Sequence, residues 1–257
     1  MSDILTRLAA LKAEGKPVCL CVVTKTRGAV PRHAGTKMLV FPDGKFEGTV
    51  GGGGVEAAAL QAALEALRDG KTRTVKYSLK EDADKSLGVC GGAMEVYIEP
   101  LLPADTLLII GAGHVGRAVA KMAGPLGFRI VVSDEREGLL DPEVFKGCQM
   151  LHAKMAELPQ KMDIGPRTFI VDVSHGSEVD VAGLPAVLAT EAGYIGVIGS
   201  KKRWATTLTG LRNQGVSEEA IGKAKSPIGL AIEAETPEEI AISILAEVIA
   251  KKNTQSA

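Results

Sequence analysis

Two glycine-rich phrases in the first hundred residues have the residue types of a binding site. Residues 50–56 read VGGGGVE and residues 89–95 read VCGGAME, so both fit Val-x-Gly-Gly-x-apolar-Glu. Glycines at this density let backbone N–H groups converge without interference from Cβ atoms, which is how proteins cradle anions. The second phrase adds a thiol, Cys90. The pair predicts a pocket for a large anionic ligand, and two tight turns are the alternative interpretation.

The elements around these phrases position them differently. Apolar positions at helical spacing predict a helix over 55–67, so the first phrase lies at the positive end of a helix. The second phrase leads into a predicted strand over 94–101. Further strands are predicted at 17–26, 36–41, 45–50 and 72–79. The candidate binding residues of the two phrases are Gly51, Gly52, Gly53, Gly54, Glu56, Gly91, Gly92 and Glu95.

The pattern changes after residue 102. A nearly pure β-branched and leucine strand is predicted at 106–110, followed by a helix over 115–126 and a strand over 128–133. Further strands are expected at 167–173 and 194–198, with helices between them. This alternation predicts a doubly wound parallel sheet. We therefore expect an α/β protein with a mixed domain over 1–102 and a Rossmann-like domain over 103–257.

The second domain opens with a nucleotide-type motif. Gly111-x-Gly113-x-x-Gly116 stands between a predicted strand and a predicted helix. The first glycine makes the turn, the second lets a pyrophosphate approach, and the third lets the helix pack on the strand. Asp134 ends the next strand, where a carboxylate can accept from a ribose 2′-hydroxyl and would repel a 2′-phosphate. A Rossmann-like scaffold that binds no nucleotide is the alternative.

Other polar residues follow the same strand ends. His114 stands at the start of the motif's helix, where it can donate to a phosphate or lie at the surface. Lys201, Lys202 and Arg203 follow the strand over 194–198. Ligands of open α/β sheets bind at the carboxyl ends of strands, so these cations can hold a phosphate or a partner's acidic patch. A solvated helix start is the alternative.

Composition narrows the class of protein. The net charge of −1 gives no polycation for nucleic acid, and no apolar run reaches the length of a membrane helix. The N-terminus has no signal-peptide pattern, so a cytoplasmic protein is expected. The four cysteines are then free thiols, and none has the spacing of a metal site. Cys19 and Cys21 are expected to be buried on one face of a strand.

Taken together, these stretches resemble the XdhC/CoxI family, whose members mature xanthine dehydrogenase and carbon monoxide dehydrogenase. The resemblance implies an XdhC-type domain followed by a Rossmann-type domain. It implies binding of molybdenum cofactor, a holding role while a cysteine desulfurase-type partner supplies sulfur, and delivery to a molybdenum hydroxylase. It also implies a dimer or larger oligomer. The matching stretches are PRHAGTKMLV, TVGGGGVEAA, GVCGGAMEVYIEPL, LIIGAGHVG, YIGVIGSKKR and SPIGLAIEAETPEEIAISILAEVI.

Under this resemblance the chain is a cofactor chaperone rather than an enzyme. Its cargo is molybdopterin or the cytosine dinucleotide form, with Glu56 and Glu95 accepting from the pterin. The Cys90 thiol is expected to approach molybdenum or carry sulfur. Gly54 departs from the family, which usually has a cysteine there. An NAD-dependent oxidoreductase and a non-catalytic nucleotide sensor are the alternatives, although no Tyr-x-x-x-Lys is present for the former.

Overall fold

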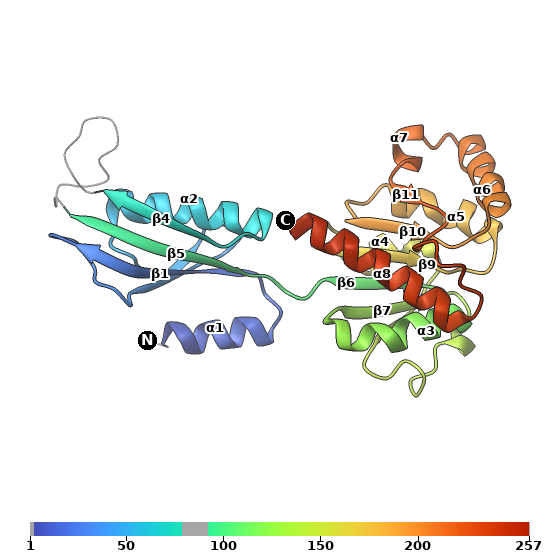
Figure 1. Cartoon of the computed structure of the whole chain (residues 1–257), viewed down its shortest axis with the longest axis horizontal. Coiled ribbons are helices and arrows are strands. Elements are labelled where there is room, and N and C mark those ends of the chain that lie inside the picture. The colour runs from blue at the N-terminus through green and yellow to red at the C-terminus, as the bar shows by residue number, and fades with distance from the viewer. Residues whose placement is uncertain (1–2, 79–91, 257) are drawn as a thin grey trace. The chain divides into compact units, whose positions relative to one another are not determined.

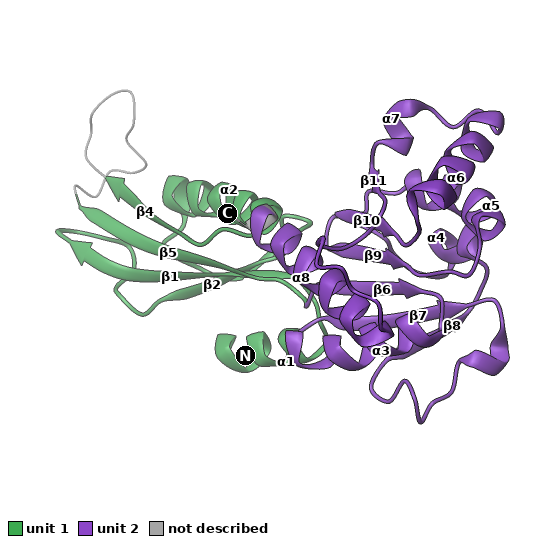
Figure 2. Cartoon of the chain, turned by 45° about the vertical axis from the view of Figure 1, so that its right-hand side comes forward, with its two compact units in different colours: residues 1–103, 256 green, residues 104–255, 257 purple. Residues whose placement is uncertain are grey.

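The structure, a computed structural model, describes residues 3–78 and 92–256. Its contacts divide the chain into two compact units, residues 1–103 and 104–255 (Figure 2). The first unit contains helices and strands with these bounds: α1 (Ile4–Ala13), β1 (Val18–Arg27), β2 (Lys37–Val40), β3 (Phe46–Gly48), α2 (Gly53–Asp69), β4 (Arg73–Ser78) and β5 (Ala93–Leu101).

The first unit is a five-stranded antiparallel sheet in the order β3-β2-β1-β5-β4. Side chains alternate between its faces. One face packs against the alanine-rich side of α2, with Val55, Ala59 and Ala63 buried. The other packs against α1 through a smaller cluster around Leu11. Figure 1 shows the two helices on opposite sides of the sheet.

The second unit holds the remaining elements. They are β6 (Thr106–Ile110), α3 (His114–Ala123), β7 (Arg129–Asp134), β8 (Gln149–His152), α4 (Leu158–Lys161), β9 (Thr168–Asp172), α5 (Ser177–Leu188), β10 (Tyr194–Val197), α6 (Lys201–Asn213), α7 (Glu218–Ile221), β11 (Ala224–Lys225) and α8 (Pro237–Ser256). The six strands are parallel, in the order β11-β10-β9-β6-β7-β8. Numbered within the unit, this is the 3-2-1-4-5-6 order of the Rossmann fold. The predicted fold class is confirmed.

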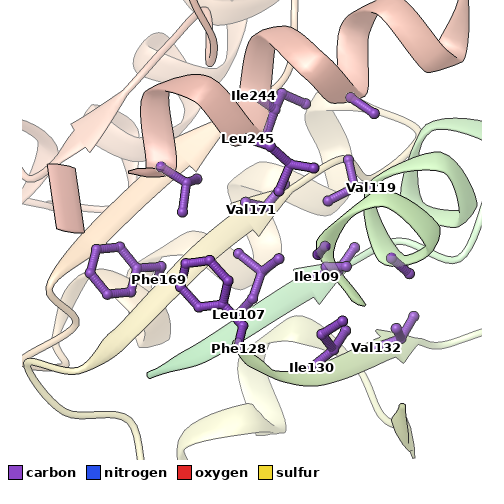
Figure 3. Close-up of a cluster of buried hydrophobic side chains, with 14 of the residues drawn as sticks. Leu107, Ile109, Val119, Phe128, Ile130, Val132, Phe169, Val171, Ile244 and Leu245 are labelled. Carbon is purple, nitrogen blue, oxygen red and sulfur yellow. The ribbon is translucent and has the colours of Figure 1, made fainter. Parts of the chain in front are cut away.

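Helices cover both faces of the second sheet. α3 and α8 bury one face, where Val119, Ile244 and Leu245 meet the strand residues Ile109 and Val171 (Figure 3). α4, α5, α6 and α7 bury the other face. The strand order reverses between β6 and β9, and the carboxyl ends of strands at such a switch point are where ligands of open α/β sheets bind. Within residues 3–78 and 92–256, no helix is long and apolar enough to cross a membrane.

Candidate functional site

The first glycine loop lies at the start of α2, as the sequence predicts. Gly51, Gly52 and Gly53 have φ values of 145°, 74° and 57°, a region that side chains other than glycine rarely adopt. A Cβ added at Gly52 or Gly53 would meet no atom within 4 Å. The loop therefore needs glycine for its backbone shape, and it leaves that backbone open at the positive end of a 17-residue helix. Such a helix start favours an anion.

Two side chains fix the shape of this loop. Thr49 accepts from the N–H of Gly51 through its hydroxyl oxygen, at 3.1 Å, and its hydroxyl is also hydrogen-bonded to the Glu56 carboxylate. Glu56 belongs to the first turn of α2, where the helix dipole favours a negative charge. Glu56 thus ties the loop to its helix through Thr49. The sequence did not single out Thr49, although it stands directly before the first phrase.

The second glycine phrase is described only in part, because Cys90 and Gly91 lie outside the described residues. Gly92 is buried, and a Cβ there would lie 2.2 Å from the Ala29 carbonyl oxygen. Gly51 approaches the same segment, since a Cβ there would lie 2.8 Å from Pro31 Cγ. The described parts of both phrases therefore pack against residues 29–31.

The two glutamates of the repeated phrase are not equivalent. Glu95 lies on β5, one residue after Met94, which packs on the α2 face of the sheet. The alternation of side chains puts Glu95 on the opposite face. There it is 3.7 Å from Lys25 Nζ and 3.9 Å from Lys76 Nζ. The structure does not bring Glu56 and Glu95 to one face.

The thiols on β1 are buried. Cys19 and Cys21 are fully enclosed in the first unit, as the sequence predicts. The pKa of the Cys19 thiol is raised. A hydrogen bond with Cys21 is the larger cause, and burial is the second. Cys19 is therefore not a thiolate at neutral pH. Within the described ranges, no group of three or more histidine, cysteine or carboxylate side chains could hold a metal ion.

The three glycines of the nucleotide-type motif differ in what surrounds them. Gly111 has a φ of 112°, and a Cβ there would lie 2.7 Å from the carbonyl oxygen of Val173. A Cβ on Gly116 would lie 1.9 Å from the carbonyl oxygen of Gly111. A Cβ on Gly113 would meet nothing within 4 Å. Gly111 and Gly116 are therefore required by packing, whereas Gly113 leaves open backbone beside the exposed His114.

Asp134 ends β7 as expected, and its carboxylate is fully engaged. Oδ2 accepts from the N–H of Ala112 at 2.8 Å and from Arg136 Nη2 at 2.9 Å. Oδ1 accepts from the backbone N–H and Nε of Arg136, both at 2.9 Å. Burial acts to raise the pKa of Asp134, but the bonds from Arg136 and Ala112 outweigh it and hold the pKa below its usual range. The sequence did not single out Arg136.

A pocket lies at the carboxyl ends of β6, β7 and β9. It has a volume of ≈ 20 Å³, about the room of one water molecule. Its lining includes Gly111, Asp134, Glu135, Arg136, Ser174 and His175. The pocket joins the glycine motif to the end of β7 at the switch point of the sheet.

The three predicted cations after β10 have different surroundings. Lys201 and Lys202 are exposed in the first turn of α6. Arg203 instead donates to Asp180, with Nη2 at 2.8 Å from Oδ1, and to the Ser174 carbonyl oxygen at 3.1 Å. Asp180 is fully buried in α5. Arg203 therefore joins α5, α6 and the loop after β9.

Asp172 is a buried acid that the sequence did not single out. It ends β9, and its Oδ1 accepts from the N–H of Ser174 at 3.0 Å. Within the described residues, its Oδ2 has no hydrogen-bond partner. Burial first, and then the charge of Asp180, raise the pKa of Asp172 to about 7.

The chain matches two family descriptions and several known proteins. Residues 11–78 match "XdhC and CoxI family", and residues 107–248 match "XdhC Rossmann domain". YqeB of Escherichia coli K12 is 36% identical over 98% of this chain, which spans about half of YqeB (46%). The molybdenum cofactor insertion chaperone PaoD of E. coli K12 is 25% identical, over 91% of this chain and 83% of PaoD.

A Bacillus subtilis 168 protein, named as a probable xanthine dehydrogenase component, is 23% identical over 97% of both chains. The crystal structure of a xanthine dehydrogenase from Bacillus halodurans has the same fold, with a TM-score of 0.53 at 24% identity over 97% of this chain and 96% of that one. The Rossmann match alone covers more than half of the residues. The chain belongs to the XdhC/CoxI family.

Proposed function

We propose that this protein is an accessory factor for molybdenum enzymes, which binds molybdenum cofactor and passes it to a xanthine-dehydrogenase-type hydroxylase. Family membership and the name of PaoD support this role. The observation that carries it is the open glycine loop at the start of α2, packed on the segment that Gly92 also contacts. Molybdenum cofactor is a phosphorylated pterin, and this loop has the chemistry to hold a phosphate.

Different residues of the first unit would bind different parts of the cofactor. The N–H groups of Gly52, Gly53 and Gly54 would hold the phosphate or polar pterin edges, and Gly51, whose N–H donates to Thr49, would shape the loop. Glu56 can accept from a pterin amino group while its link to Thr49 keeps the loop in shape. Glu95 would have to exchange its lysine partners to do the same.

The sulfur chemistry rests on the second phrase. We propose that the Cys90 thiol contacts the cofactor's metal or carries sulfur, beside the N–H groups of Gly91 and Gly92. A cysteine desulfurase-type donor would supply the sulfur, a molybdenum hydroxylase would receive the cofactor, and the chaperone would act in the cytoplasm as an oligomer. Gly54 leaves the first loop without the thiol that is usual in the family, so Cys90 would act alone.

The second unit would bind a nucleotide. Gly111, Gly113 and Gly116 have the surroundings that a pyrophosphate site needs, with Gly113 open at the start of α3. His114, Lys201 and Lys202 are exposed and can meet phosphates. The cytosine dinucleotide form of the cofactor or a separate NAD-type ligand would fit this chemistry. The same motif favours a nucleotide-sensing regulator or an NAD-dependent oxidoreductase as the second candidate function.

The test is to load the purified protein with cofactor and measure bound molybdenum by mass spectrometry. Gly53→Ala should lower the molybdenum content, because it strains an open loop at φ 57° without filling the core. Gly44→Ala is the matched control, since Gly44 has φ 81° and equally open surroundings in the β2–β3 turn. The absence of molybdenum from the wild-type protein would reject the role. Tight NADH binding with hydride transfer to a carbonyl would favour the oxidoreductase.

A further inference from the structure

The carboxylate of Asp134 has no lone pair left for a ligand. A carboxylate offers about four lone-pair sites on its two oxygens. Here Ala112 and Arg136 supply four N–H contacts, two to each oxygen, at 2.8–2.9 Å. The Asp134 side chain is also only 4% exposed. A ribose hydroxyl that needs this carboxylate as an acceptor would have to displace Arg136 first.

Arg136, in contrast to Asp134, keeps hydrogen-bonding groups that a ligand can use. Its side chain is 45% exposed at the rim of the pocket beside Gly111. Two of the five guanidinium N–H groups point to Asp134. Within residues 3–78 and 92–256, the other three have no protein partner. The bidentate contact with Asp134 fixes the guanidinium plane, so these donors are pre-oriented for an oxyanion.

Because the pocket is small, a nucleotide would contact Arg136 at the rim of the pocket. The enclosed space beside Asp134 has room for about one water molecule. A nucleotide that lies across the carboxyl ends of β6, β7 and β9 would therefore meet Arg136 first. In Rossmann folds this is the place where a carboxylate accepts from a free ribose, or an arginine holds a ribose 2′-phosphate.

We propose that the second unit binds a nucleotide phosphorylated on its ribose, and that Arg136 is the group that selects it. Asp134 is then a positioning residue that orients Arg136. This reverses the sequence expectation, in which Asp134 repels a 2′-phosphate. The exposed Glu135 beside Arg136 opposes phosphate binding, and it is screened by solvent. The inference rests on the proposed nucleotide binding by the second unit and names the ligand class, whereas the molybdenum role of the first unit does not depend on it.

The experiment compares NADP⁺ with NAD⁺, which differ only in the 2′-phosphate, by calorimetric titration of the full chain. NADP⁺ should bind about tenfold or more tightly than NAD⁺, as expected for charge-assisted hydrogen bonds. Arg136→Gln should bring the ratio to about one, and Arg136→Lys should leave an intermediate ratio because it keeps the charge without the fork. Arg212→Gln, which removes an exposed ion pair with Glu218 on the same unit, is the matched control and should keep the full ratio.

A second variant keeps the test independent of folding. Glu135→Gln leaves the Asp134–Arg136 contact in place and removes the opposing charge, so it should raise the NADP⁺/NAD⁺ affinity ratio. Equal or tighter binding of NAD⁺ to the wild type would overturn the inference, as would an unchanged ratio in a folded Arg136→Gln protein. Failure of both dinucleotides to bind would also overturn it, while the chaperone role would still be decided by the molybdenum measurement.

Discussion

Replacing Gly116 by alanine tests whether the glycine motif is held by packing. Gly116 lies in the third position of α3, directly over the turn that Gly111 makes at the end of β6. An added Cβ would be 1.9 Å from the Gly111 carbonyl oxygen and 3.0 Å from its carbonyl carbon. Contacts between carbon and a carbonyl oxygen lie at about 3.3 Å or more, so the helix or the turn must move by about 1.4 Å.

This displacement determines how much free energy of unfolding the substitution loses. Overpacking a well-packed site destabilises by about 1–3 kcal/mol, and a clash with backbone belongs at the upper end. Alanine recovers about 1 kcal/mol through its helix propensity. The net loss in the free energy of unfolding should be about 2 kcal/mol, which lowers the melting temperature of a unit of this size by about 4–8 °C.

The assay is urea unfolding followed by the fluorescence of Trp204. This is the only tryptophan of the sequence, and it packs against the core of the second unit. Gly138→Ala, at a site with no atom within 4 Å of the added Cβ, is the control and should be as stable as the wild type or slightly more stable. If Gly116→Ala unfolds at the same urea concentration as Gly138→Ala, the packing argument for the motif is wrong.

Three further predictions concern other contacts. Because the pKa of Asp172 is raised from 3.8 to about 7, the folded protein binds more protons than the unfolded chain between these values, and the free energy of unfolding should fall as pH rises from about 4 to about 7. Asp172→Asn should flatten this slope. The stability of the variant relative to the wild type, measured by urea midpoints, should therefore be greater at pH 8 than at pH 4. Glu247→Gln should destabilise the second unit by about 1–3 kcal/mol, because the buried Glu247 accepts from Tyr194 and pairs with Lys225, whereas Glu238→Gln on the exposed side of α8 should not. Thr49→Val should lower bound molybdenum by loosening the glycine loop, and an unchanged molybdenum content beside a Thr209→Val control would show that the Thr49 link is dispensable.

Local patterns were sufficient to predict much of the fold. The buried strand β6 has the predicted bounds, because five consecutive apolar or β-branched residues fit only a strand covered on both faces. A capping box starts α8, with the N–H of Glu239 donating to Thr236 Oγ1 at 3.2 Å and the N–H of Thr236 donating to Glu239, and the local Thr-Pro-Glu-Glu pattern is typical of it. The short strands β8 and β11 were not predicted, because they lie at the sheet edges with partly exposed side chains.

The candidate sites depended more on contacts that a sequence does not reveal. The glycine positions followed from spacing, but the cover over Asp134 depends on the side-chain conformation of Arg136, two residues away. An arginine so near the end of this strand was the available signal. The Asp180–Arg203 pair joins residues 23 positions apart, and no periodicity relates them. Glu56 and Glu95 share a sequence phrase, yet one begins a helix and the other alternates to the far face of a strand.

The most direct test of the proposed role is the amount of molybdenum that the protein retains after loading with cofactor and gel filtration. We expect retained molybdenum in wild-type protein and in Gly44→Ala, with a clear loss in Gly53→Ala. Wild-type protein that retains no molybdenum, or equal retention in all three proteins, would contradict it.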